Sequence, residues 1–361
     1  MKTTPLFFFL LLLSGLSIQA QTNEELARQK AVEAIKLMDN GQLEESIVLL
    51  QESKKLDSTN YIYAYEIALA NVYLKNYQTA IDELESILTD ENISSQVYQL
   101  LGNCYSMKGD KDKALTSYEQ GLEKFPEAGN LHLEKGNVYT QTEKYNLAIK
   151  SYEQGVLNAP SFPSNYYQLA KIFLRSSNKV PGLIYGEIFM NLERTTARTQ
   201  EMSSLLYEAY KGAIQLMGDS MSLDFCEPVI AITDESLEKE EIQLPYCMIF
   251  GKSMLIAITV ASPDSISLSS LAQIRRNFID IYVQNDMEEH PNVLLQYHQD
   301  MVDKGVFDAY NHYLFQIPNQ ADFNAWLQDN REAYDKFVEW YLAPENLIDI
   351  NKENRYISFG R

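Results

Sequence analysis

Residues 102–105 read Gly-Asn-Cys-Tyr, and residues 136–139, which lie 34 positions later, read Gly-Asn-Val-Tyr. The same landmarks then follow each segment: an alanine at Ala114 and Ala148, the tetrapeptide Tyr-Glu-Gln-Gly at 118–121 and 152–155, and a proline at Pro126 and Pro160. A fixed period of this length is typical of proteins in which helical units stack on one another, because one unit alone cannot bury its apolar face.

The period extends in both directions from these two units. Upstream, residues 70–73 (Ala-Asn-Val-Tyr) begin the same pattern with two residues deleted from its turn, and a weaker unit begins near Ala27. Downstream, residues 170–173 (Ala-Lys-Ile-Phe) begin a unit that loses the pattern. We therefore predict a repeat domain over 21–217, with units at 27–60, 63–94, 95–128, 129–162, a degenerate unit at 163–194 and a capping helix at 199–217.

These residues resemble the tetratricopeptide repeat, in which each unit is a helix A, a turn and a helix B. The resemblance implies an all-α superhelix with three kinds of landmark: a small residue where the helices meet (Ala70, Gly102, Gly136, Ala170), an aromatic residue three positions later (Tyr73, Tyr105, Tyr139, Phe173) and an early alanine in helix B (Ala80, Ala114, Ala148). Small side chains let two helices approach closely, the aromatic ring is expected to fill the space between neighbouring pairs, and proline ends helix B.

The resemblance also implies a concave groove lined by the A helices. The residue after each small position is expected to point into it, which gives a ladder of Asn71, Asn103, Asn137 and Lys171, with the neighbours Gln99, Met107, Gln141, Tyr167 and Arg175. Amides can hydrogen-bond the backbone of an extended or helical partner. Asparagine is also common at this position in the family whatever the ligand, so a purely structural role stays open. Gln99 and Glu134 do not suit a carboxylate clamp, and an acidic partner is expected only at Lys171 and Arg175.

The second half of the chain is predicted to be helical too. We place a linker at 218–242 and a helical C-terminal domain, to which the sequence assigns no role, at 243–361. Its expected helices cover residues 244–261, 268–284, 292–304, 306–315, 321–329 and 331–342. Aromatic residues at helical spacing in the last two are interpreted as core rather than as a ligand cage.

The N-terminus has the pattern of a secretory signal peptide. Residues 1–20 combine an early lysine, a run of eight apolar residues and a small residue, Ala20, before Gln21. We expect cleavage after Ala20, export to the periplasm or beyond, and no membrane-spanning segment in the mature chain. The Ala20-Gln21 junction and three Asp-Ser/Thr-apolar tripeptides, at 57–59, 219–221 and 264–266, resemble those of exported proteins of Bacteroidota.

Charge and cysteine content restrict the possible partners further. The chain has 30 Lys and Arg against 50 Asp and Glu, a formal net charge of −20, which disfavours nucleic acid and anionic lipid. Three cysteines allow at most one disulfide, for which Cys226 with Cys247 is the pairing to consider; three buried thiols are the alternative.

The sequence contains no phosphate-binding glycine-rich loop, nucleophile elbow or H-E-x-x-H helix, so we predict neither an enzyme nor a cofactor. The leading hypothesis is an exported scaffold that binds a protein or peptide. One alternative is a recruiting arm attached to an enzymatic or metal-binding C-terminal domain, with a site built from His290, His298 and His312 and the nearby Glu288, Glu289 or Asp300. Another is a structural subunit of an envelope assembly.

Overall fold

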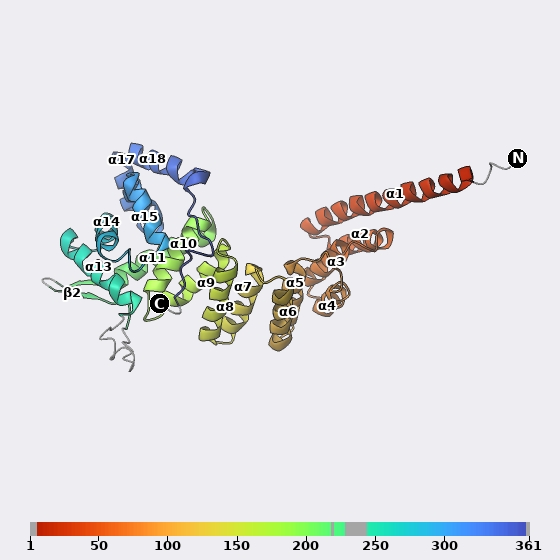
Figure 1. Cartoon of the computed structure of the whole chain (residues 1–361), viewed down its shortest axis with the longest axis horizontal. Coiled ribbons are helices and arrows are strands. Elements are labelled where there is room, and N and C mark those ends of the chain that lie inside the picture. The colour runs from red at the N-terminus through yellow and green to blue at the C-terminus, as the bar shows by residue number, and fades with distance from the viewer. Residues whose placement is uncertain (1–5, 218–219, 228–243, 359–361) are drawn as a thin grey trace. The chain divides into compact units, whose positions relative to one another are not determined.

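The computed structural model describes residues 6–217, 220–227 and 244–358, and almost all regular structure in these ranges is α-helix (Figure 1). The chain divides into two compact units, Met1–Thr142 and Glu143–Arg361, called unit 1 and unit 2 below. The division falls between the two helices of the fourth predicted repeat. The sequence places the domain boundary at 218–242 instead, and the packing of the C-terminal helices, described below, explains the difference.

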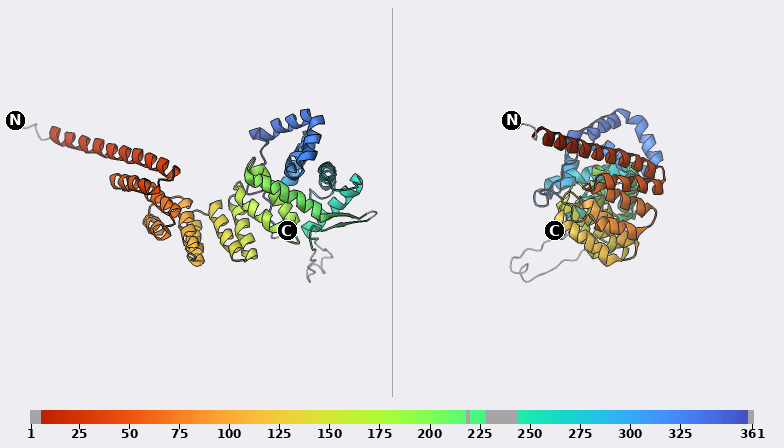
Figure 2. Two further views of the ribbon diagram at one scale, coloured as in Figure 1. Left: turned by 180° about the vertical axis from the view of Figure 1, so that it is seen from behind. Right: turned by 90° about the vertical axis from the view of Figure 1, so that its right-hand side faces the viewer.

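Unit 1 consists of three antiparallel helix pairs followed by α7, and Figure 2 shows these helices from two further sides. Its helices are α1 (Leu6–Asp39), α2 (Leu43–Leu56), α3 (Ile62–Tyr73), α4 (Tyr77–Glu85), α5 (Ser95–Met107), α6 (Lys111–Lys124) and α7 (Gly129–Gln141). The pairs α1/α2, α3/α4 and α5/α6 match the first three predicted repeats. Gly41 and Gly109 have φ angles of 80° and 88° in the turns between paired helices, a conformation in which glycine is the least strained residue.

The glycine at the start of the third repeat allows close helix packing. The buried ring of Tyr118 on α6 lies against Gly102 on α5, so that a Cβ atom added to Gly102 would be 2.2 Å from Tyr118 Cε1. The expected role of the repeated aromatic residue is wrong at Tyr73, whose side chain is 58% exposed. Helix α3 ends at Tyr73, whereas α5 continues for two residues past Tyr105. The shortened turn therefore leaves the Tyr73 ring at the end of its helix pair.

Unit 2 combines the last repeat helices with the C-terminal helices. Its elements are α8 (Tyr145–Asn158), α9 (Pro163–Phe173), α10 (Val180–Leu192), α11 (Ala197–Ala213), β1 (Ile214–Met217), β2 (Ser220–Leu223), α13 (Tyr246–Ala261), α14 (Leu268–Asn285), α15 (Val293–Asp303), α16 (Phe307–Leu314), α17 (Gln320–Asp329) and α18 (Arg331–Leu342), with 3-10 turns at Ile317–Asn319 and Pro344–Asn346. The six helices predicted after residue 243 are all present, with ends that differ by at most two residues.

A hairpin replaces the end of the predicted capping helix. Helix α11 stops at Ala213, and the next four residues form β1, which pairs antiparallel with β2 in the register Ile214↔Leu223. Side-chain exposure alternates along both strands, and the ladder gives the backbone groups partners that a frayed helix end would lack. The strand β2 lies within the predicted linker, of which residues 218–219 and 228–242 fall outside the described residues.

Helix α10 explains why the C-terminal helices belong with the last repeat. It is buried from Val180 to Asn191, with α9 on one side and α11 and α15 on others. A helix that is apolar all round requires neighbours all round. The B helix of the degenerate repeat is therefore the centre of unit 2, and the C-terminal helices do not form a separate domain.

Helix α1 contains most of the predicted signal peptide. It runs without interruption from Leu6 to Asp39, and residues 1–5 lie outside the described residues. Cleavage after Ala20 stays a prediction. No helix is long and apolar enough to cross a membrane among the residues whose side chains the structure describes, which in α1 begin at Asn23.

Candidate partner-binding surface

Polar side chains of two successive A helices form a hydrogen-bonded network. Asn130 on α7 donates through Nδ2 to Gln99 Oε1 on α5 at 2.8 Å, and Gln99 Nε2 donates to Glu134 Oε1 at 2.9 Å. Asn137 Nδ2 donates to Glu134 Oε2 at 3.1 Å. The structure thus brings Gln99 and Asn137 together through Glu134, all of them partly exposed. The network fixes the directions in which these side chains point.

Asn103 is held by one side of its amide group. Tyr118 Oη donates to Asn103 Oδ1 at 2.6 Å, and the side chain of Asn103 is partly exposed. Within the described part of the chain, its NH₂ group has no acceptor. Two N–H donors fixed in direction can donate hydrogen bonds to the carbonyl oxygens of a bound chain.

Asn71 has a different role from the other asparagines. It is only 5% exposed, its Nδ2 donates to the carbonyl of Ile67 at 2.8 Å, and its Oδ1 accepts from Asn76 Nδ2 at 3.4 Å. Both ends of the amide are in use, and the group joins α3 to the following turn. We therefore remove Asn71 from the predicted surface, because a buried amide that bonds its own helix cannot contact a partner.

The two remaining candidates of unit 1 lie near the ends of their helices. Met107, the last residue of α5, is 54% exposed. Gln141, the last residue of α7, accepts through Oε1 from Lys111 Nζ at 2.6 Å, and Lys111 Nζ also donates to Ser106 Oγ at 2.8 Å. Lys111 therefore belongs to this surface, although the sequence prediction missed it. It lies on a B helix, outside the ladder that the period defines.

The candidates of unit 2 form a separate set on α9 and α11. Lys171 Nζ lies 3.3 Å from Glu201 Oε1 and 4.9 Å from the centre of the Tyr167 ring, and Tyr167 Oη donates to Glu201. The hydrogen bond from Tyr167, followed by the contact with Lys171, lowers the pKa of Glu201. Glu201 therefore pairs with Lys171 within the chain, and the exposed Arg175 also contributes to the lowered pKa of Glu201.

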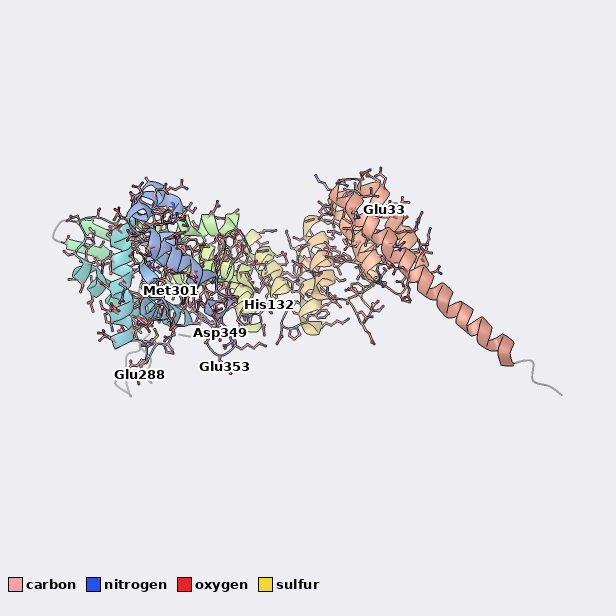
Figure 3. All side chains as sticks on the ribbon, turned by 90° about the horizontal axis from the view of Figure 1, so that it is seen from above. Glu33, His132, Glu288, Met301, Asp349 and Glu353 are labelled. Carbon is pink, nitrogen blue, oxygen red and sulfur yellow. A yellow bond between two sulfur atoms is a disulfide. The ribbon has the colours of Figure 1, made fainter. Side chains whose placement is uncertain are left out.

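The three histidines of the metal hypothesis lie in different surroundings. His298 is buried with Nε2 at 2.6 Å from Glu187 Oε1, and the His312 ring stacks on Trp326 at 4.0 Å. The backbone N–H of His290 donates to the carbonyl of Asp286. Among the described residues, no group of three or more His, Cys, Asp or Glu side chains is arranged to hold a metal ion. His132 on α7, labelled in Figure 3, is far from these residues in sequence and belongs to unit 1.

Glu187 and Arg275 form the centre of a closed polar cluster in unit 2. The guanidinium of Arg275 donates to both carboxylate oxygens of Glu187, at 2.6 and 2.9 Å, and Tyr310 Oη donates to the same carboxylate at 2.9 Å. Burial opposes ionisation of Glu187, but Arg275 and then His298 overcome it and hold its pKa well below the usual range. The adjoining cavity is about 10 Å³, room for about one water, so the cluster does not form a ligand site.

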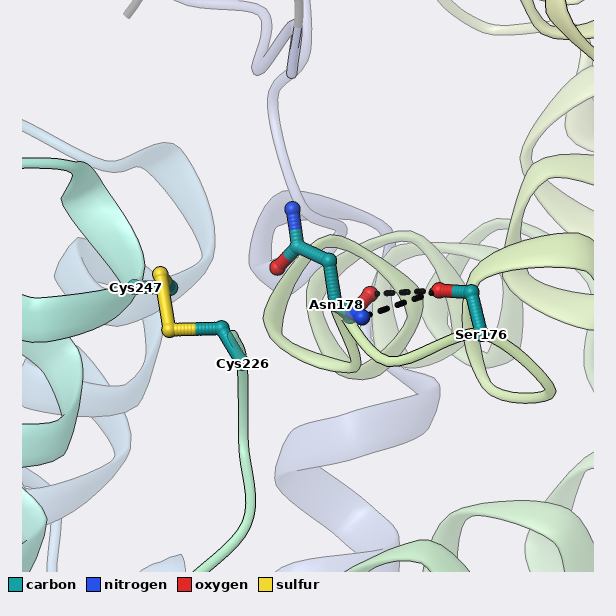
Figure 4. Close-up of a disulfide and its surroundings, with 4 residues drawn as sticks. All are labelled: Ser176, Asn178, Cys226 and Cys247. Atoms are coloured by element: carbon teal, nitrogen blue, oxygen red, sulfur yellow. Dashed lines mark hydrogen bonds between the residues drawn. A yellow bond between two sulfur atoms is a disulfide. The ribbon is translucent and has the colours of Figure 1, made fainter. Parts of the chain in front are cut away.

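The disulfide Cys226–Cys247 is present, next to the turn that contains Ser176 and Asn178 (Figure 4). The structure thus contains the pairing that the sequence left open. Cys104 is free and buried on α5, and burial raises its pKa to about 11. A thiol that stays protonated and covered is unreactive, so we assign Cys104 a packing role.

Comparisons with known proteins show that the chain contains tetratricopeptide repeats. The family model described as tetratricopeptide repeat matches residues 95–128 and, in a second form, residues 130–162. These ranges overlap the third and fourth predicted units. One curated relative, the BBSome complex member BBS4 of Bos taurus, is 30% identical over 87 residues, which are 24% of this chain and only 17% of the relative.

Two solved structures show the extent of the structural likeness. A thermophilic TPR protein of Thermus thermophilus is 17% identical, with a TM-score of 0.41, and the match covers 50% of this chain and 98% of that protein. PilF of Pseudomonas aeruginosa is 16% identical, with a TM-score of 0.44, and the match covers 52% of this chain and 86% of that one.

Proposed function

We propose that this protein is an exported, non-enzymatic scaffold that binds a protein or peptide partner through the polar surface of α5 and α7. The observation that carries the proposal is the amide of Asn103, whose oxygen is fixed by Tyr118 while its NH₂ group has no acceptor in the described part of the chain. Tetratricopeptide repeats at 95–128 and 130–162 support protein binding as the general role.

The arrangement supports recognition of a backbone rather than of one particular side chain. Asn103 offers N–H donors, and Gln99, Glu134 and Asn137 are oriented by one another. The exposed thioether of Met107 adds an adaptable apolar contact at the end of α5. Such a surface favours an extended or helical segment of a partner over a small ligand.

Export is part of the proposal, supported by the signal-peptide pattern of residues 1–20 and by the disulfide Cys226–Cys247. Disulfides persist mainly in oxidising compartments outside the cytosol. Fractionation of the producing cells followed by N-terminal sequencing tests this part. We expect the mature chain outside the cytosol to begin at Gln21; an intact chain confined to the cytosol would disprove export.

Partner capture tests the surface. The mature protein, immobilised and exposed to envelope or secreted fractions, is compared with Asn103→Asp, which keeps the acceptor for Tyr118 but removes both N–H donors. We expect partner recovery to fall by about tenfold, as the loss of one or two hydrogen bonds to a partner implies. Gln120→Ala removes an exposed amide from helix B of the same repeat and serves as the matched control. Equal recovery by all three proteins would refute the surface assignment.

A further inference from the structure

The C-terminal segment of the chain packs on repeat helices of unit 2. After α18 and the turn at Pro344–Asn346, the backbone returns to the region of α8–α10 without forming a further helix or strand up to residue 358 (Figure 1). The ring of Tyr356 is 3% exposed and lies 5.1 Å from the ring of Tyr185 on α10 and 6.0 Å from that of Tyr246. The segment is therefore bound to the repeat helices by a buried aromatic anchor.

A buried carboxylate recognises the residues that follow this anchor. Glu153 on α8 is 3% exposed, and its Oε1 accepts from the backbone N–H of Ser358 at 2.8 Å, from Ser358 Oγ at 2.5 Å and from Tyr185 Oη at 2.6 Å. A carboxylate taken out of water requires such donors, and two of the three belong to the C-terminal segment. The chemistry recognised is thus a backbone N–H together with a hydroxyl group.

In the preceding repeat the corresponding position faces solvent. Glu119 occupies the same place in the third repeat, 34 residues earlier, and its side chain is 53% exposed with Lys135 Nζ at 2.9 Å. Both glutamates stand in the same tetrapeptide, Tyr-Glu-Gln-Gly. The difference in exposure is therefore not explained by that tetrapeptide. The C-terminal segment contacts Glu153 and covers it.

The bound segment fits its site incompletely. Nε and Nη1 of Arg355 are buried without an acceptor in the described part of the chain, which costs free energy that release of the segment would recover. Ile357 also borders a cavity of about 560 Å³ along α8, lined by Asn146, Leu147, Lys150, Glu153, Gln154 and Leu157. Residues 355–358 therefore do not fill the space beside α8.

We propose that α8 and α10 form a peptide-binding site that residues 355–358 occupy as an internal competitor. A partner replaces them when it presents an extended segment with an aromatic residue two positions before a serine or threonine, which matches Tyr356 and Ser358. This site uses Glu153 and Tyr185 and none of the α5 and α7 residues of the proposed function, so either proposal can fail alone. A partner must therefore displace the C-terminal segment, which requires a higher concentration than binding to an empty site.

The test uses a fluorescent peptide with the sequence of residues 351–361, titrated with the mature protein and with a chain that ends at Asn354. We expect the shortened chain to bind the peptide saturably and the complete chain to bind at least about tenfold more weakly, because a tethered competitor acts at an effective concentration in the millimolar range. Alanine at the peptide position of Tyr356 or Ser358 is expected to weaken binding by about tenfold. A folded shortened chain that does not bind, or equal binding by both chains, overturns the proposal.

Matched substitutions make the test specific. In the shortened chain, Glu153→Gln is expected to weaken peptide binding by about tenfold, since it removes the charge from the acceptor, while Glu119→Gln leaves binding unchanged. If the shortened chain does not fold, hydrogen exchange of the Ser358 amide in the complete chain replaces the titration. Exchange that is about tenfold faster in Glu153→Gln than in Glu119→Gln supports the site, and equal exchange in the two variants refutes it.

Discussion

The guanidinium of Arg275 on α14 and the carboxylate of Glu187 on α10 form a doubly hydrogen-bonded ion pair in which both side chains are at most 3% exposed. The pair joins a repeat helix to a C-terminal helix. It is one of the contacts that join residues on both sides of 218–242 within the same unit.

Removal of Arg275 should destabilise unit 2 strongly. Arg275→Met leaves the buried charge of Glu187 without its partner, and we expect a loss of about 3–5 kcal/mol in the free energy of unfolding, measured with urea. Arg276→Met is the control, since the neighbouring Arg276 pairs with Asp280 at the surface and its loss should cost well under about 1 kcal/mol. Similar losses in the two variants would contradict a central role for the buried pair.

Stability should fall as the pH is lowered through the titration range of histidine. Burial, the largest influence, lowers the pKa of His298 in the folded protein, against the attraction of Glu187. The unfolded chain therefore binds a proton near pH 6.5 that the folded chain does not, and stability is lost below that pH.

The variant His298→Gln isolates this contribution. Urea unfolding between pH 7 and 5 should show a slope smaller by up to about 1.4 kcal/mol per pH unit than in the wild type. Burial also lowers the pKa of His132 and His312, so part of the pH dependence should remain. An unchanged slope would show that His298 is not responsible.

Thiol counting should reveal one free cysteine, and only after unfolding. Cys104 is buried with its pKa raised to about 11, and Cys226 and Cys247 are joined. We expect no labelling of the native protein, one label after denaturation and three after reduction as well, read by mass spectrometry. Cys226→Ala with Cys247→Ala should lower stability by about 3 kcal/mol, because it releases a loop with a sequence separation of 21. Three labels on the denatured, unreduced chain would show that Cys226 and Cys247 are not joined.

Alanine at Gly102 should disrupt the third repeat. Its Cβ atom would lie 2.2 Å from Tyr118 Cε1, so the ring or α5 must move, at a cost of about 1–3 kcal/mol or more. Gly251, inside α13, has no atom within 4 Å of an added Cβ, and Gly251→Ala should instead stabilise the protein by up to about 1 kcal/mol. Thermal unfolding followed by circular dichroism compares the two, and a neutral Gly102→Ala would refute the tight contact.

The repeat could be predicted from the sequence because its information is local and repeated. Gly102 and Tyr118, with their partners 34 residues later, fix helix lengths, turns and close approaches by spacing alone. The expected repeat boundaries therefore agree with the helix pairs of unit 1. Tyr73 departs from the pattern where the turn is two residues shorter, so the spacing does not predict the exposure of its side chain.

The candidate surface was predictable only in part. The side chains of Asn103 and Asn137 are partly exposed, whereas that of Asn71 is buried, and the period alone does not predict this difference in burial. Lys111 and the Tyr118 hydroxyl escaped prediction because they act from helix B. A polar residue on the helix opposite the ladder carries no periodic signal of its own.

The sequence by itself determined the stacked helix pairs, because small, aromatic and turn residues at a fixed period restrict neighbouring helices through short-range contacts. Only the tertiary structure decided that the degenerate repeat forms a core with the C-terminal helices, and that Ser358 reaches Glu153 across 205 positions. Glu187, Arg275 and Ser358 stand singly in the sequence, without a repeat to mark them, and the repeated tetrapeptide that contains Glu153 does not distinguish it from Glu119. Contacts between residues so distant in the sequence depend on the tertiary packing of the helices, and no local sequence pattern predicts them.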